Sequence, residues 1–266
     1  MSWKWVVATY FAIMVAAFVP WSGGRAASVN VIGSSSVQPF AEALAEEFHK
    51  AHPAYKVDVQ GGGSTVGLQA TRDGIADLGM CSRSLNKDEA KEFNTVTLAL
   101  DGLAIVVHPS NPVDNLSVKH VRQIFAGEVT DWRDVGGAPG PIRLVVREES
   151  SGTREAFMKL VMGKQRVAPH AMNQDSNGAI KELVKDDRQS IGFVSLGLVT
   201  KEIKALRMDG VNATVAEVKA KRYPLVRPFL FVMKGEPGER AQGYINYVLS
   251  PEGQRLLAQE GLVPIK

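Results

Sequence analysis

The stretch PIRLVVREESSGTREAF at residues 141–157 passes from a strand through a hydroxyl-rich turn into a helix. PIRLVV at 141–146 is rich in β-branched residues, which is typical of a strand. SSGTREAFMKLVMG at 150–163 begins with residues that cap helices and continues with amphipathic spacing. A strand, a short turn and a helix in this order form the repeating unit of an α/β fold.

The same order of strand, turn and helix recurs along the chain. VNVIG at 29–33 precedes a helical pattern over 37–51, and KVDVQ at 56–60 precedes another that runs through Asp73. These patterns predict an α/β fold whose sheets are mostly parallel and flanked by helices. The remaining predicted strands lie at 76–80, 94–100, 102–108, 191–195 and 223–232, and the remaining helices at 117–125, 178–186 and 239–259.

Two proline-bearing segments, HPSNPV at 108–113 and YPLVRP at 223–228, bracket the middle of the chain. They suggest that the chain leaves a first lobe, builds a second lobe and then returns. We therefore predict a discontinuous lobe I, residues 28–108 and 224–266, and a continuous lobe II, residues 109–223.

The first 27 residues have the pattern of a secretory signal peptide. Lys4 precedes an uncharged, mostly apolar run over 5–19, and small residues lead to Ala26 and Ala27. Cleavage after Ala26 puts Gly24 and Ala26 at the positions that need small residues, whereas cleavage after Ala27 would put Arg25 at one of them. The alternative is an uncleaved membrane anchor, for which the uncharged stretch 5–24 is barely long enough. Because no cysteine lies near the junction, the prediction is a periplasmic protein without a lipid anchor.

Charge and cysteine content exclude several classes of protein. The 266-residue chain has a formal net charge of +3, but outside the predicted signal peptide it holds 29 basic and 28 acidic residues. A nearly neutral surface gives no general attraction for nucleic acid or anionic membrane. The single cysteine, Cys81, excludes an internal disulfide and a two-cysteine redox or zinc motif, and we expect it to be buried.

Three turns between a strand and a helix are rich in Ser, Thr and Gly. They are GSSS at 33–36, GGGST at 61–65 and SSGT at 150–153. A helix start offers unpaired N–H groups and a partial positive charge, and hydroxyl groups add donors, so such turns suit an anion. Simple N-capping of each helix is the alternative. Three such turns in one α/β chain favour a shared oxyanion site.

Arg147 lies at the end of the strand 141–146, four residues before Ser151. A guanidinium presents a planar fork of donors that can hold two oxygens of a tetrahedral anion. The alternative is a solvated arginine balanced by Glu148 and Glu149, which could instead point away from it.

On these motifs the chain resembles the periplasmic phosphate-binding proteins of phosphate ABC transporters, the PstS-type proteins. The resemblance extends in order over nearly all of residues 29–265 and implies a two-lobed type II periplasmic binding protein that closes on its ligand. The segments that carry it are GSSSV at 33–37, GGGST at 61–65, DLGMCSRSL at 77–85, DGLAIVVHPSNP at 101–112, IFAGEVTDW at 124–132, RxxxSGT at 147–153, IGFVSLG at 191–197, YPLVRPFLF at 223–231 and YVLSPEGQ at 247–254.

The resemblance also implies a set of anion contacts. Long-chain relatives often have an aspartate at the position of Ser82, where it accepts the proton of hydrogen phosphate, so refusal of sulfate is less assured here. Arg83 is a candidate second cation, with a surface arginine as the alternative. The matching positions are Ser36, the backbone of Val37, Ser64, Arg147, Ser151, Gly152 and Thr153.

The expected function is therefore capture of inorganic phosphate and its delivery to an ABC-type permease, by a monomer without cofactor or catalytic residues. His49 and His52 lie three apart, but nothing nearby completes a metal site. The alternatives are a binder of sulfate or arsenate, a phosphatase with the same anion cradle, and a sensor built on the binding fold. No GxSxG elbow or P-loop supports an enzyme.

Overall fold

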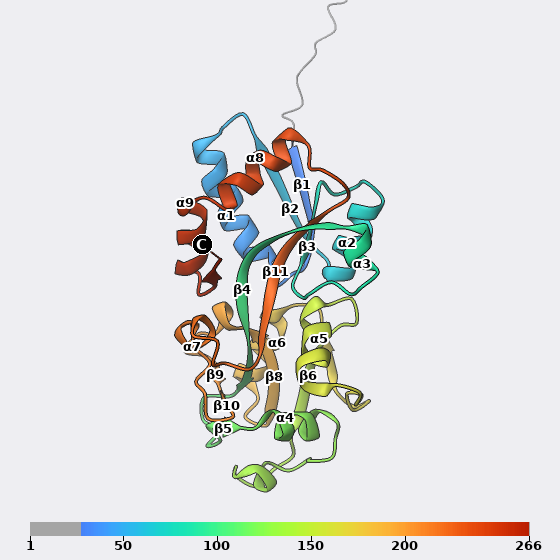
Figure 1. The fold of residues 1–266 in the computed structure, drawn as a ribbon. Helices are drawn as coiled ribbons and strands as arrows, with labels where there is room; N and C mark the ends of the chain where they lie inside the picture. The colour runs from blue at the N-terminus through green and yellow to red at the C-terminus, as the bar shows by residue number, and fades with distance from the viewer. Residues whose placement is uncertain (1–27, 266) are drawn as a thin grey trace, which may run out of the picture.

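The computed structural model describes residues 28–265. The predicted signal peptide and its cleavage positions lie outside these residues. The described chain forms two lobes, one above the other in Figure 1, which are connected by the long strands β4 (Asn94–Val107) and β11 (Val226–Met233). The predicted two-lobed α/β fold is thus confirmed.

Lobe I is built on the parallel strands β2, β1 and β3, and β11 adds to β3 in the antiparallel direction. α1 packs on this sheet because Phe40, Leu44 and Phe48 recur on one side of the helix and are all buried. Besides the connecting strands, the elements of this lobe are β1 (Ser28–Gly33), α1 (Gln38–Ala51), β2 (Lys56–Gly61), α2 (Ser64–Arg72), β3 (Leu78–Cys81), α3 (Glu89–Glu92), α8 (Glu239–Val248), α9 (Pro251–Gln259) and β12 (Val263–Pro264).

The predicted helix over 239–259 is two helices. The first helix ends at Val248. Ser250 caps the second, because its side chain accepts a hydrogen bond from the N–H of Gly253, and Pro251 occupies the first turn of α9. Proline is favourable at a helix start and unfavourable in a helix interior, which explains the break.

Lobe II is built on the parallel strands β8, β6 and β7, and its sheet joins the antiparallel strand β4. Parallel pairs therefore lie inside each lobe, and antiparallel pairs occur where the two connecting strands enter. The elements of this lobe are β5 (Asn115–Leu116), α4 (Val118–Phe125), η1 (Trp132–Val135), β6 (Arg143–Arg147), α5 (Gly152–Phe157), η2 (Met158–Met162), β7 (Met172–Gln174), α6 (Asn177–Asp186), β8 (Ser190–Ser195), η3 (Leu196–Leu198), β9 (Lys204–Ala205), β10 (Arg207–Met208) and α7 (Val215–Lys219).

β4 is one strand of 14 residues, where the sequence predicted two. Its first part pairs with β11 from Asn94 to Gly102, and its last part pairs with β8 from Leu103 to Val107. Asp101, which separates the two predicted strands, lies where β4 passes from one lobe to the other. The predicted lobe boundaries at 108/109 and 223/224 stay a prediction, although Leu103 to Val107 already pair within lobe II.

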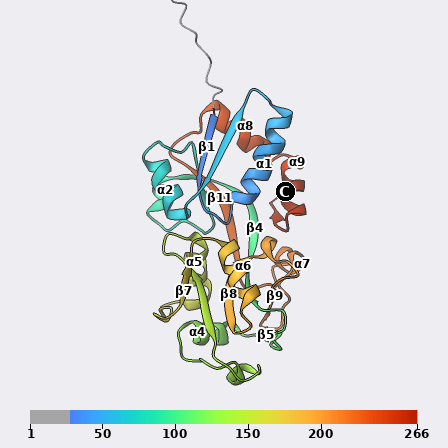
Figure 2. The ribbon, with the colours of Figure 1, turned by 180° about the vertical axis from the view of Figure 1, so that it is seen from behind.

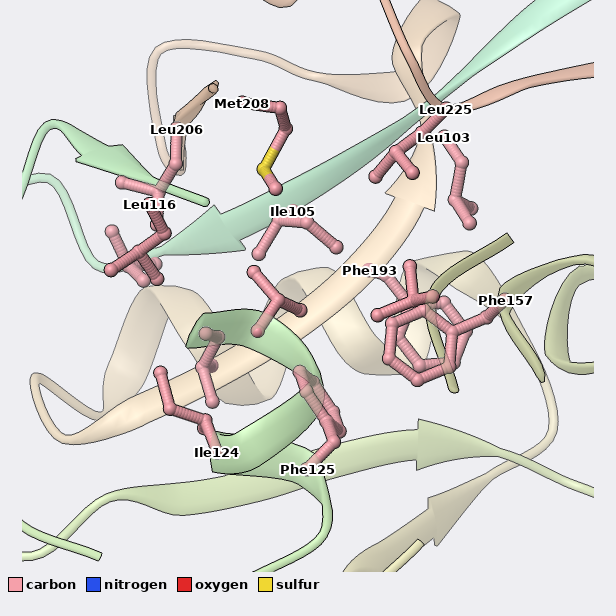
Figure 3. Close-up of a cluster of buried hydrophobic side chains, with 14 of the residues drawn as sticks. Leu103, Ile105, Leu116, Ile124, Phe125, Phe157, Phe193, Leu206, Met208 and Leu225 are labelled. Atoms are coloured by element: carbon pink, nitrogen blue, oxygen red, sulfur yellow. The ribbon is translucent and has the colours of Figure 1, made fainter. Parts of the chain in front are cut away.

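The buried cluster of lobe II fixes the position of α5 (Figure 3). Phe157, at the end of α5, stacks on Phe193 of β8, with ring centroids 4.1 Å apart and an interplanar angle of 5°. Phe125 of α4 meets the ring of Phe157 edge-on at 4.7 Å. Aromatic pairs of this kind contribute about 0.5–1.5 kcal/mol each beyond the area that they bury.

Seen from behind, α5 and α6 both reach from lobe II toward lobe I (Figure 2). The N-terminal ends of these helices thus lie at the junction of the lobes. Within residues 28–265, no helix has both the length and the apolar character needed to cross a membrane.

Candidate functional site

The three hydroxyl-rich turns meet at the junction of the two lobes. Each follows the carboxyl end of a parallel strand, β1, β2 or β6. Ser36 Oγ of lobe I lies 2.6 Å from Thr153 Oγ1 of lobe II, and the N–H of Thr65 donates to the carbonyl of Ser150 at 3.2 Å. Ser36 and Thr153 are almost completely buried. The turns therefore line one closed interlobe site, which we call the cleft.

Two of the turns do not use their hydroxyl groups as helix caps. The N-cap positions of α1 and α2 are Val37 and Gly63, and neither helix has a side-chain cap. Ser36 and Ser64 are buried and face other polar side chains instead. The capping interpretation holds only for the third turn, where Ser151 Oγ accepts from the N–H of Arg154 at 3.3 Å.

Gly152 allows the two lobes to approach closely at the third turn. A methyl group at this position would clash with Ser64 Oγ and would lie 2.8 Å from Ser82 Oγ, both on lobe I. The backbone N–H groups of Gly152 and Thr153 open α5 and have no acceptor among residues 28–265. A glycine and two free N–H groups at a helix start form a surface that an anion can approach closely.

Arg147 is buried, with 1% of its surface exposed, and is not the solvated arginine of the alternative interpretation. Its Nε and Nη2 donate to the two carboxylate oxygens of Glu148 at 2.9 and 2.8 Å. Nη2 also donates to Ser35 Oγ at 2.8 Å, and Nη1 lies 3.5 Å from Ser36 Oγ. Glu148 compensates the charge from one side, so that Nη1 is directed at the hydroxyl groups of the cleft.

Ser64 and Ser82 lie next to each other on lobe I. Ser64 Oγ accepts from the N–H of Ser82 at 3.0 Å, and the two hydroxyl oxygens are 3.4 Å apart. The N–H of Val37, also predicted to contact the anion, donates to the carbonyl of Ser34 at 3.0 Å. The side chains of Ser36, Ser64, Ser82, Arg147 and Thr153 are thus brought together, whereas the N–H of Val37 is used within its own turn.

Arg83 is not brought into this group. Its guanidinium donates to both oxygens of Glu89 at 2.7 and 2.9 Å, and it approaches Glu155 of lobe II at 2.6 Å. The hydrogen bonds from Arg83 hold the pKa of Glu89 below its usual range. Arg83 therefore joins the lobes beside the cleft rather than facing its hydroxyl groups. Cys81 is buried as expected, and burial raises the pKa of its thiol.

Two polar residues of the cleft were not predicted from the sequence. Asn177 Nδ2 donates to Ser36 Oγ at 2.8 Å, and Ser35 Oγ accepts from Arg147. Asn177 opens α6 directly after the cap residue Ser176, so that Ser176, Asn177 and Gly178 form a fourth polar turn between a strand and a helix. This order of elements is the signal that could have identified Asn177.

The arrangement can bind a small oxyanion between the lobes. Hydroxyl groups, an amide, free N–H groups and a guanidinium converge from both lobes, and most of these groups are buried. Preorganised donors in a water-excluded site interact strongly with negative charge, since little solvent screens them. Hydroxyl groups can also accept a proton, which a protonated oxyanion offers.

Comparisons with known proteins agree with this geometry. A family described as the PBP superfamily domain matches residues 21–252. The phosphate-binding protein PstS of Bacillus subtilis (strain 168) is 30% identical over 243 residues, which are 90% of this chain and 81% of that protein. Each of these similarities spans both predicted lobes.

Two solved structures show the same architecture. A Clostridium perfringens structure, described as a phosphate ABC transporter substrate-binding protein with bound phosphate, has 36% identity and a TM-score of 0.87, and covers 90% of this chain and 100% of that chain. An ABC-type phosphate transport receptor from Vibrio cholerae has 38% identity and a TM-score of 0.76, and covers 88% and 99% of the two chains.

Proposed function

This chain belongs to the PBP superfamily and, within it, to the PstS-type phosphate-binding proteins, and on that premise we propose that it binds inorganic phosphate in its cleft. One observation carries the proposal. The buried hydroxyl groups of Ser36 and Thr153, from opposite lobes, lie 2.6 Å apart beside the buried guanidinium of Arg147.

Binding would use these groups without a chemical reaction. Ser36, Ser64 and Thr153 donate to phosphate oxygens, Arg147 supplies positive charge, and the N–H groups of Gly152 and Thr153 complete the contacts. No carboxylate or imidazole within residues 28–265 hydrogen-bonds to the hydroxyl group of Ser36 or Ser64. A hydroxyl nucleophile needs such a base, which supports a binding protein over a phosphatase.

Selectivity between phosphate and sulfate would be moderate. Ser82 is buried, and its hydroxyl lies 3.4 Å from that of Ser64, at the position where a carboxylate would repel sulfate. A hydroxyl can accept the proton of hydrogen phosphate, but it can equally donate to fully ionised sulfate. We expect arsenate to bind almost as phosphate does and sulfate to compete measurably.

Isothermal titration of the purified, anion-stripped protein with phosphate, arsenate and sulfate tests the proposal. We expect tight binding of phosphate, similar binding of arsenate and weaker binding of sulfate. Absence of binding for all three anions would overturn the proposed function. Turnover of a generic phosphomonoester that is lost in Ser36→Ala would instead favour the phosphatase.

The role in transport follows as part of the same proposal. The chain would act in the periplasm as a monomer, closing on phosphate and presenting it to an ABC-type permease. Cell fractionation, size-exclusion chromatography and phosphate uptake by a strain that lacks the protein would test these three points separately. Protein retained in the cytoplasm, or uptake unchanged by its loss, would contradict the transport role.

A further inference from the structure

Arg227 and Asp101 form a buried ion pair where the connecting strands pass between the lobes. The two residues face each other in the antiparallel pairing of β11 and β4. Their side chains are 1% and 0% exposed, and Arg227 Nε lies 2.8 Å from Asp101 Oδ2. Neither residue was predicted to belong to the site, because each lies within a strand rather than in a hydroxyl-rich turn.

Asp101 is held rigidly by three donors. Its Oδ1 accepts from Ser195 Oγ at 2.7 Å and from the N–H of Leu196 at 3.2 Å, while Oδ2 accepts from Arg227. A carboxylate removed from water is stable only where protein donors replace the lost water, as these three donors do. Asp101 therefore fixes the position of the Arg227 guanidinium.

Arg227 Nη1 is directed at the cleft. Nη1 donates to Thr153 Oγ1 at 2.6 Å and lies 3.4 Å from the carbonyl oxygen of Ser82. Nη2 is buried and has no hydrogen-bond partner among residues 28–265. An unpaired donor on a buried cation is costly, so its presence on a guanidinium that already contacts Thr153 of the proposed anion site points to a ligand that completes it.

Arg147 and Arg227 approach the same pair of hydroxyl groups from two sides. Arg147 Nη1 lies beside Ser36 Oγ, and Arg227 Nη1 donates to Thr153 Oγ1, while these two oxygens are 2.6 Å apart. Each arginine is paired with one carboxylate, Glu148 or Asp101, so that the four groups are neutral together. Burial lowers the pKa of Arg227, and the nearby Arg147 cation acts in the same direction.

We infer that Arg227 is a second cation of the anion site, held by Asp101, and that the site is built for a doubly charged tetrahedral anion. This inference rests on the proposed function and specifies its ligand. Each guanidinium keeps an Nη atom that its own carboxylate does not use, and charge-assisted hydrogen bonds from these atoms are stronger to an oxyanion with two negative charges than to one with a single charge. A monoanion gains less from the second guanidinium, because it carries less negative charge.

The test is a phosphate titration below and above the second ionisation of phosphate. It compares the wild type with Arg227→Gln, Arg227→Lys and the control Arg72→Gln, which breaks the Arg72–Glu92 pair outside the cleft. Above the ionisation, we expect Arg227→Gln to weaken binding at least about 30-fold. Below it, the loss should be clearly smaller, and Arg227→Lys should keep part of the preference for the dianion.

The outcomes separate this inference from the proposed function. A wild type that binds no phosphate overturns both. Wild-type binding together with an unchanged Arg227→Gln, or with an equal loss at both pH values, overturns the second cation alone. If Arg227→Gln does not fold, Arg227→Lys decides, because a folded lysine variant that has lost the preference for the dianion contradicts the inference.

Discussion

The two lobes contribute different chemistry to the cleft. The side of lobe I presents the neutral hydroxyl groups of Ser36, Ser64 and Ser82. The side of lobe II presents the guanidinium of Arg147 together with Thr153. Arg83 of lobe I does not add charge to the cleft, because Glu89 and Glu155 hold it beside the cleft. The inferred second cation, Arg227, comes from the connecting strand β11.

This difference separates two tasks of an anion-binding site. A fixed positive charge governs how strongly negative charge is held, whereas hydroxyl groups can adjust to oxygens that do or do not carry a proton. Variants of the two sides should therefore fail in different ways. Loss of charge on lobe II should weaken all anions, and changes on lobe I should alter the choice among them.

The largest effect is expected for Arg147→Ala. The change removes a buried charge of lobe II and leaves Glu148 unpaired, so that affinity for phosphate should fall by about 2–5 kcal/mol. Phosphate and sulfate should be affected alike, which titration of both anions would reveal. Arg143→Ala, at the exposed start of β6, is the control and should bind as the wild type does. Unchanged affinity in Arg147→Ala would show that lobe II does not supply the charge.

Gly152→Ala should have the next largest effect on phosphate affinity, because it prevents lobe II from approaching lobe I closely at the cleft. The added methyl group would clash with Ser64 across the cleft, and overpacking of this kind costs about 1–3 kcal/mol. Phosphate affinity should fall accordingly, while the thermal unfolding temperature without anion should change little, since the lobes can separate. Gly243→Ala, in α8 far from the cleft, is the matched control, because nothing lies within 4 Å of the added methyl group there. Wild-type affinity in Gly152→Ala would contradict the close approach.

Ser82→Asp should alter selectivity on the side of lobe I. A carboxylate can accept the proton of hydrogen phosphate but repels sulfate, so the ratio of the two affinities should rise by about 1–3 kcal/mol. Titration with both anions measures this ratio. Ser82→Asn has a similar size without the charge and should leave the ratio near that of the wild type. An unchanged ratio in Ser82→Asp would place residue 82 outside the anion region.

The smallest effect concerns Arg83 and Glu89. The pKa of Glu89 is lowered in the folded protein, so the pair stabilises the fold above the unfolded pKa of about 4.3 and loses this contribution as the pH falls through the folded value. Glu89→Gln should flatten the acid limb of the stability curve but leave phosphate affinity at neutral pH nearly unchanged. Unfolding at several pH values together with one titration checks both. A large loss of affinity would bring Arg83 into the site.

Much of this architecture could be predicted from local patterns. The strands, the helices and the hydroxyl-rich turns follow from periodicity and turn chemistry, and within these turns the resemblance to the phosphate-binding proteins pointed to Ser36, Ser64 and Thr153. The direction of a long side chain does not follow from such patterns. Arg83 depends on Glu89 and on Glu155, which lies 72 positions away, so no local signal indicates where its guanidinium points.

Contacts between the connecting strands could not be predicted from the sequence either. Arg227 and Asp101 face each other only because β11 returns beside β4 after the whole of lobe II. Each is a charged residue within an apolar run, and without its partner such a residue indicates that the strand ends there. For the same reason β4 was predicted as two strands, although a buried ion pair allows it to continue through Asp101.

The passage of β4 and β11 between the lobes also determines the order in which the protein can fold. Lobe II consists of one continuous segment between these strands, whereas lobe I needs both ends of the chain. Tyr244 of α8, for example, donates to the carbonyl of Ala41 in α1, 203 positions earlier. During synthesis, the segment that forms lobe II is complete before the last helices of lobe I emerge. We therefore expect lobe II to fold first. The N-terminal segment of lobe I can complete its packing only after β11 and α8 have been synthesised.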